Sequence, residues 1–265
     1  MRGNSQFAAA IRDLTGAIRL APLWSRMSVE ATVTRYRRAV LGPFWLATST
    51  LATAVGLTLV FGVLMGGDWR SNFPFVLAGL MAWGLVGALV ANGSSVFIAA
   101  AGLMQTRPLP LSFHVSLLIS RSVIDFAHQL IAFWIVMAVF RLFPVPHWHL
   151  LFSLPLVIVT AFFVIFPVAL ASTRFRDIHY FVGFVMGVAF LLTPVFWRRA
   201  AMPAERQWIV NYNPLSHMLE VLRQPLLGHP APLLNWGGVL TTLVVAAVLT
   251  VIGLTLYRRR VVFWV

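Results

Sequence analysis

Cysteine and lysine are both absent from the 265-residue sequence, and acidic residues number only seven. Without cysteine the chain can form no disulfide and offers no thiol for chemistry. Without lysine it cannot contain a GxxxxGK[ST] phosphate-binding loop, so this chain is not a P-loop ATPase. The acids are scattered singly, which argues against the paired carboxylates of a glycosidase. Only His147 and His149 lie close together, so the sequence predicts no metal site.

Charged residues of either sign are scarce, whereas apolar residues are abundant. They make up 10% and 60% of the chain, against roughly 25% charged residues in an average soluble domain. Since a bilayer span needs about 20 apolar residues, a chain of this length has room for six or seven spans. Six segments qualify: Phe44–Met65, Phe73–Ala100, Phe113–Phe140, Leu150–Ser172, Ile178–Trp197 and Trp236–Tyr257. The second is long enough to tilt or to continue past the bilayer. We therefore predict an all-α integral membrane protein with six transmembrane helices.

The formal net charge of +13 comes from arginine alone, and the arginines lie at the ends of the spans. We interpret them as a sign of membrane orientation and not of nucleic-acid binding. With the N-terminus inside, the cytoplasmic side carries Arg2, Arg12, Arg19, Arg26, Arg35, Arg37, Arg38, Arg107, Arg174, Arg176, Arg258, Arg259 and Arg260. Fewer arginines fall on the other side, and most of those lie in one long loop. Both termini are therefore expected to be cytoplasmic, with 1–43 as interface helices, 44–257 as the transmembrane domain and 258–265 as a tail.

Two one-faced helices are expected before the first span. Apolar residues recur at helical spacing at Phe7, Ile11, Leu14 and Ile18, and again after Pro22 at Val29, Val33, Tyr36 and Val40. Arg35, Arg37 and Arg38 fan around the rest of the second helix, towards water and anionic headgroups. Gly42-Pro43 then lets the chain turn into the bilayer. This corner is either an orientation anchor or, together with Phe44 and Trp45, a doorway for a negatively charged lipid substrate.

The third span contains the one cluster of ionisable residues expected at membrane depth. Arg121, Asp125 and His128 share a helix face, and Arg121 can pair with Asp125 within the helix. Two interpretations remain open. The cluster is a structural ion pair, or it is part of a proton relay in a secondary transporter.

The loop from 198 to 227 is expected to form an external helical hairpin. Its second half has an apolar stripe at Leu215, Met218, Leu219 and Leu222, with His217, Glu220 and Arg223 off the stripe. Asn213 and Pro214 supply a plausible cap and first position. We predict two short re-entrant helices that dip into the outer leaflet as a gate. The alternative is a hairpin that lies on the surface with no role in transport.

Five short motifs occur in an order that is similar to one family. They are Arg35-Tyr36-Arg37-Arg38 with Leu41-Gly42-Pro43-Phe44-Trp45, then Gly102-Leu103-Met104 with Arg107-Pro108, Phe175-Arg176-Asp177, Thr193-Pro194-Val195-Phe196-Trp197, and Asn213-Pro214-Leu215 with Glu220 and Arg223. Over residues 20–257 the chain resembles permease subunits of type-2 ABC exporters, which move lipid-linked polysaccharides such as O-antigen, capsule and teichoic acid.

The resemblance implies a homodimer in a bacterial inner membrane that works with two copies of a separate ATP-binding subunit. That partner would hold ATP and magnesium, so this chain would be neither an enzyme nor a cofactor protein. The substrate would be a polysaccharide on a polyprenyl-diphosphate anchor, and Arg35, Tyr36, Arg37, Arg38, Phe44 and Trp45 would form the place where it enters.

The same resemblance suggests two further sets of residues. The partner subunit would dock on Leu103, Gln105, Arg107, Arg174, Arg176 and Asp177. The external gate would contain Trp197, Asn213, Pro214, Glu220 and Arg223. A proton-coupled transporter, a drug exporter of the same superfamily and a membrane glycosyl or acyl transferase remain as alternatives.

Overall fold

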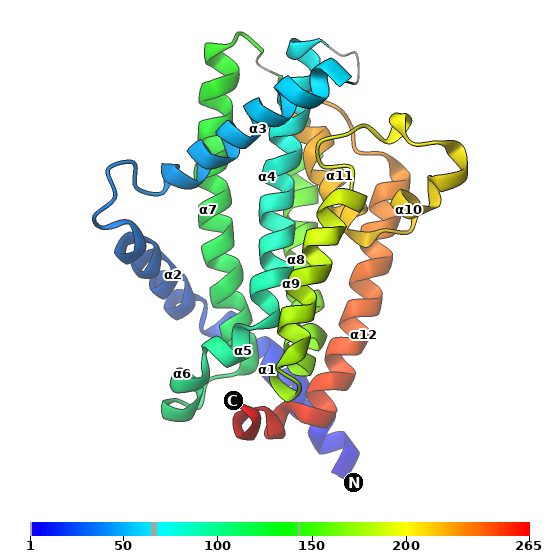
Figure 1. Ribbon diagram of the computed structural model, residues 1–265. Helices are drawn as coiled ribbons and strands as arrows, with labels where there is room; N and C mark the ends of the chain where they lie inside the picture. The colour runs from blue at the N-terminus through cyan, green and yellow to red at the C-terminus, as the bar shows by residue number, and fades with distance from the viewer. Residues whose placement is uncertain (1, 65–67, 143) are drawn as a thin grey trace.

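The computed structural model describes residues 2–64, 68–142 and 144–265, and every regular element within these ranges is helical. The long helices are α3 (Phe44–Leu64), α4 (Trp69–Ser94), α7 (Leu111–Val139), α8 (Leu150–Arg174), α9 (Asp177–Leu192) and α12 (Leu233–Trp264). The others are α1 (Arg2–Arg19), α2 (Ala21–Tyr36), α5 (Val96–Ala99), α6 (Ala101–Thr106), α10 (Trp208–Asn211) and α11 (Pro214–Leu226). Both termini lie at the same end of the molecule, with α5 and α6, whereas α10 and α11 lie at the opposite end (Figure 1). We call these the terminal end and the distal end.

Five helices are long and apolar enough to cross a membrane: α3, α4, α7, α8 and α12. They confirm five of the six segments chosen from the sequence, although Met65 lies outside the described residues. The remaining segment, Ile178–Trp197, forms α9, which is apolar but has only 16 residues. At 1.5 Å per residue such a helix extends about 24 Å, less than the roughly 30 Å of bilayer hydrocarbon. The sixth span therefore stays a prediction.

Helix α4 is the central helix of the bundle. In its most apolar stretch 72% of the residues are buried, against 17% for α3 and 22% for α7 and α12. It packs against α3, α7, α8, α9 and α11, and the fully buried Phe73, Met81 and Leu89 lie on it. The less buried helices expose apolar side chains such as Val244 and Val248 of α12. An apolar outer surface of this kind fits a lipid environment.

The long second segment does continue past the end of its helix. Helix α4 stops at Ser94, and the chain then forms two short helices with breaks at Ser95 and Ala100. The Oγ of Ser94 is hydrogen-bonded to Nδ1 of His179 on α9 at 2.8 Å. This contact joins α9 to the point where the chain turns at the terminal end.

The N-terminal helices turn their apolar stripes away from the protein. On α1, Phe7 and Ile18 are exposed, and on α2, Val29 and Val33 are exposed. The buried side of α2 is polar instead, and there Ser28 donates a hydrogen bond to the carbonyl oxygen of Leu117 on α7 at 3.3 Å. The apolar spacing extends the second helix too far, because α2 ends at Tyr36 and Val40 lies in the following turn.

Asp13, on the buried side of α1, connects three helices at the terminal end. Its carboxylate accepts hydrogen bonds from the first two backbone N–H groups of α7, those of Leu111 and Ser112, at 3.2 and 3.0 Å. It also pairs with Arg258 of α12 at 2.8 Å. Only 2% of Asp13 is exposed. A carboxylate in this position caps the N-terminus of α7 and is stabilised by the positive end of the helix dipole.

We expect replacement of Asp13 by alanine to lower the free energy of unfolding by about 2 kcal/mol, because a helix cap and a charge-assisted hydrogen bond are lost together. Thermal melting of the purified protein in detergent measures the change. Glu30→Ala is the matched control, since Glu30 is an exposed acid on α2. Equal melting temperatures for the two variants would contradict the role assigned to Asp13.

Candidate functional site

The corner between α2 and α3 is attached to α7 through Arg35. Its Nη1 atom lies 3.1 Å from Oδ2 of Asp125. This corrects the predicted pair, because Asp125 bonds to an arginine 90 positions away in the sequence and not to Arg121. The Nε atom of Arg121 is buried and has no hydrogen-bond partner among the described residues. Arg35, Arg37 and Arg38 are all exposed, as expected, but Arg35 also binds Asp125.

Three successive contacts tie the corner to one face of α7. They are made by α7 residues at positions i, i+3 and i+4, namely Asp125, His128 and Gln129. Asp125 binds Arg35, the ring of Phe44 meets the ring of His128 edge-on at 5.6 Å, and Thr50 donates a hydrogen bond to Gln129 at 3.3 Å. Residues at this spacing lie side by side on a helix. The shared face predicted for Asp125 and His128 is therefore used for packing the corner against the bundle.

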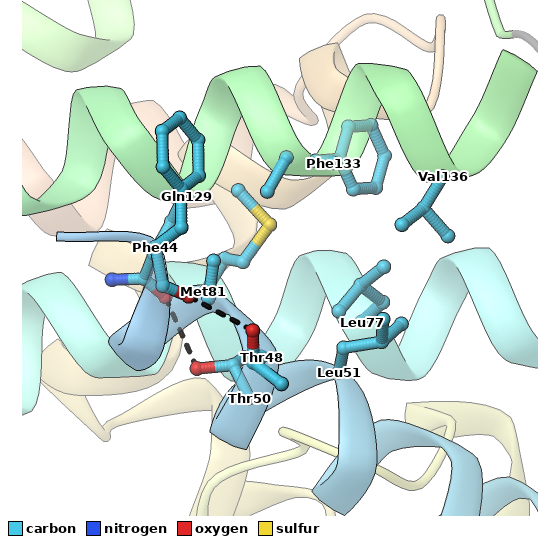
Figure 2. Close-up of a pocket in the computed structure, with 11 residues that line it drawn as sticks. Phe44, Thr48, Thr50, Leu51, Leu77, Met81, Gln129, Phe133 and Val136 are labelled. Atoms are coloured by element: carbon cyan, nitrogen blue, oxygen red, sulfur yellow. Dashed lines mark hydrogen bonds between the residues drawn. The ribbon is translucent and has the colours of Figure 1, made fainter. Parts of the chain in front are cut away.

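A small cavity lies between α3, α4 and α7, next to these contacts. Figure 2 shows Thr50 and Gln129 turned towards each other and, beyond them, an apolar lining that includes Met81 and Phe133. Its volume of about 80 Å³ admits a few water molecules.

The outer side of the corner combines positive charge with exposed aromatic rings. Trp45 is 62% exposed and Phe44 is 37% exposed. Tyr36 is half-buried, and the guanidinium of Arg35 lies 5.8 Å from the centre of its ring. Arginines beside exposed aromatic residues are suited to a membrane interface with anionic lipid.

The residues predicted to dock a partner subunit lie at the terminal end. Gln105, Arg107, Arg174, Arg176 and Asp177 are exposed, and Leu103 is half-buried. They come from α6 and from the link between α8 and α9. We call these six residues the terminal surface.

The C-terminal residues, for which sequence reasoning gave no role, contribute to the terminal surface. Helix α12 continues to Trp264, so most of the segment predicted as a tail is helical. Gln105 donates a hydrogen bond to the carbonyl oxygen of Val265 at 3.5 Å, and the guanidinium of Arg174 lies 5.7 Å from the ring of Trp264. The apolar residues after the three final arginines were the only sequence signal for this packing.

At the distal end Arg223 is buried, with 1% of its side chain exposed. The sequence pattern placed Arg223 on the polar side of an amphipathic helix, and its burial corrects that expectation. Its Nη1 atom donates to the carbonyl oxygens of Pro194 and Val195 at 2.6 and 3.2 Å, and its other nitrogens bind Glu220. Its guanidinium also lies 3.9 Å from the ring of Phe75 on α4. Arg223 therefore attaches α11 to the start of the segment that follows α9.

One other residue of the predicted gate, Asn213, holds the same connection. Asn213 is the cap of α11, accepting a hydrogen bond from the backbone N–H of Leu215 at 2.9 Å, and its amide nitrogen donates to Thr193 at 2.9 Å. Pro214 is the first residue of the helix, as expected. The indole N–H of Trp197 donates to the carbonyl oxygen of Leu191 at 3.2 Å.

Close approach of α4 to this segment depends on Gly79. A Cβ atom there would collide with the carbonyl oxygen of Val195, one of the two that bind Arg223.

The two arms of the external hairpin differ. The second arm is the helix α11, which packs between α4, α8 and α12 (Figure 1). The first arm has only two 3₁₀ turns, Arg199–Ala201 and Ala204–Arg206, and the single turn α10. Its position relative to the outer leaflet stays a prediction.

The described helices define a multi-pass, all-helical membrane protein. Residues 24–227, more than half of the chain, match the ABC-2 type transporter family, and the chain therefore belongs to that family. Two Klebsiella pneumoniae proteins, each described as O-antigen export system permease protein RfbA, are similar to it. Each is 23% identical over 232 residues, which cover 85% of this chain and 86% of the relative.

We expect Asp125→Asn to lower the melting temperature more than Arg35→Gln does. Arg35 also repels Arg121, so loss of Asp125 leaves two arginines facing each other without a carboxylate. We expect a cost of about 2 kcal/mol for Asp125→Asn, and about 0.5 kcal/mol for Arg35→Gln, because that pair is partly exposed.

Thermal melting of the purified variants tests this order. Glu205→Gln, at an exposed acid in the external segment, is the control and should melt like the unaltered protein. A larger loss from Arg35→Gln than from Asp125→Asn would contradict the prediction, because it would show that an unpaired Asp125 carboxylate costs more than the repulsion between the two arginines.

Proposed function

We propose that this chain is the permease subunit of an ATP-driven exporter that moves a lipid-linked polysaccharide across the bacterial inner membrane. The observation that carries the proposal is the family match over residues 24–227, together with similarity along most of the chain to permeases named for O-antigen export. In this proposal two copies of the chain form the channel, and two copies of a separate subunit bind ATP and Mg²⁺. Both termini lie in the cytoplasm.

The corner between α2 and α3 supports an anionic lipid substrate. Arg37 and Arg38 are exposed beside Trp45, which places positive charge next to an aromatic surface suited to a membrane interface. A diphosphate anchor carries the charge that arginine recognises. We infer that the anchor meets Arg37 and Arg38 first, while Arg35 is held by Asp125.

The terminal surface is the proposed docking site for the ATP-binding subunit. It offers exposed charge at Arg107, Arg174, Arg176 and Asp177, and it is joined to the bundle through the end of α12. Because this chain has no lysine, it cannot supply a P-loop, and ATP hydrolysis must come from the partner. Small rigid-body movements of the helices would transmit the hydrolysis cycle.

Purification of the tagged chain from its native membrane in mild detergent tests the proposal. We expect an ATP-binding protein to co-purify in equal amount and to hydrolyse ATP. Repeated isolation of the chain alone, without ATPase activity, would reject the exporter mechanism and direct attention to proton coupling through Asp125.

Combined replacement of Leu103, Gln105 and Arg107 by alanine is expected to uncouple ATP hydrolysis from export. Hydrolysis should persist in reconstituted vesicles, while export falls at least about tenfold, the equivalent of 1.4 kcal/mol of lost coupling. Arg26→Ala, at an exposed arginine of α2 outside the terminal surface, is the control. Unchanged coupling in the triple variant would remove these residues from the docking site.

A further inference from the structure

A polar cavity with a volume of about 270 Å³ lies at the distal end, between α4, α11, the start of α12 and the segment after residue 197. It is larger than the cavity beside the corner and approaches the roughly 300 Å³ at which small-molecule pockets begin. A single sugar residue matches this size. The polar side chains that matter to its chemistry are Arg198, Arg199, Ser216, Glu220, Arg223 and Asn235.

The cavity has an excess of positive charge. Glu220 is its one lining carboxylate, and it is paired with Arg223. Arg198 donates to the backbone carbonyl of Ser71 and the side-chain oxygen of Asn72 at 3.2 and 3.4 Å, both of which are uncharged acceptors. Its guanidinium is held 4.4 Å from the ring of Phe75. Two arginines, 198 and 199, are therefore left without a carboxylate partner among the described residues.

Arg199 is the arginine that is free to bind a ligand. It is half-buried on the cavity wall, and its side chain has no hydrogen-bond or ion-pair partner in the part of the chain that the structure describes. A guanidinium presents paired N–H donors whose geometry matches a carboxylate or a phosphate. The free charge therefore favours an anionic ligand.

Ser216 provides a second, independent sign of a ligand. It is only 1% exposed, it lines the cavity, and its Oγ has no hydrogen-bond partner within the described ranges. A buried hydroxyl without a partner is destabilising, so such groups are usually paired with protein, water or ligand. A ligand with hydroxyl groups would satisfy it.

We propose that this cavity binds an acidic sugar residue, which carries its carboxylate or phosphate towards Arg199 and a hydroxyl towards Ser216. The choice of a sugar rests on the proposed function, since a glycan that leaves the channel reaches the distal end. The negative charge of the ligand is inferred from the cavity alone, because Arg199 has no carboxylate partner among the described residues. The cavity would then favour glycans with uronate or phosphorylated residues over neutral glycans.

Binding of monosaccharides to the full-length chain in nanodiscs of phosphatidylcholine tests the inference, with saturation-transfer NMR as the measurement. The probes are glucuronate, glucose 1-phosphate and glucose. We expect both acidic sugars to bind at least about tenfold more tightly than glucose, as the loss of one charge-assisted contact implies. Equal binding of glucose would overturn the inference.

Variants locate the site. Arg199→Gln should weaken binding of both acidic sugars at least about tenfold, and Ser216→Ala should weaken it severalfold. Arg206→Gln, at an exposed arginine of the same segment that does not line the cavity, should leave affinity unchanged. An unaltered melting temperature of Arg199→Gln shows that the variant is folded. Unchanged affinity in that variant, or equal losses in the control, would overturn the inference.

Two further experiments identify the source of the anion. Competition by inorganic phosphate as strong as that by glucose 1-phosphate would show a site for a free anion and would refute the sugar. Loss of glucuronate binding in nanodiscs that contain phosphatidylglycerol would assign the cavity to a lipid headgroup.

These outcomes are separate from those that test the exporter. The binding experiment requires neither ATP nor a partner subunit. If an ATPase co-purifies with the chain but the chain does not bind acidic sugars, only this inference is refuted. Acidic-sugar binding by a chain without an ATPase partner would refute only the proposed function.

Discussion

The carboxylate of Asp13 is the contact on which the terminal end depends. It caps α7, pairs with Arg258 of α12 and belongs to α1, so it joins helices from the beginning, middle and end of the chain. A buried charge that loses its partners is costly, which keeps the three helices together. The last residues of α12 also reach Gln105 and Arg174, so Asp13 helps to hold a helix that contacts the terminal surface.

A corresponding constraint acts at the distal end through Arg223. Its guanidinium binds two carbonyl oxygens after α9 and a carboxylate on its own helix, and it contacts Phe75 on the central helix. Together with the cap at Asn213, these bonds fix α11 against the rest of the bundle. A gate built from α11 would have to move with its buried arginine still paired, which favours movement of the whole distal unit.

Features that depend on local sequence could be predicted. The apolar segments are long enough to identify five spans, and Asn213-Pro214 gave the correct start of α11, because caps act within one turn. The helix periodicity also placed Asp125 and His128 on one face. It could not identify the partner of Asp125, since Arg35 is on another helix, and the only partner that helix geometry offered was Arg121.

The burial of Asp13 could not be predicted either. In the sequence it is a single acid among the polar residues of an amphipathic helix, and nothing there distinguishes it from an acid exposed to solvent. Composition and short-range periodicity were enough to establish the membrane class, the apolar segments and the absence of a P-loop lysine. The packing of the helices was needed to show which charges are buried, that α11 lies inside the bundle and that Arg199 has no partner among the described residues. The physical reason is that a buried charge is stabilised by groups from other helices, and their distance in space is set by the packing of the whole chain.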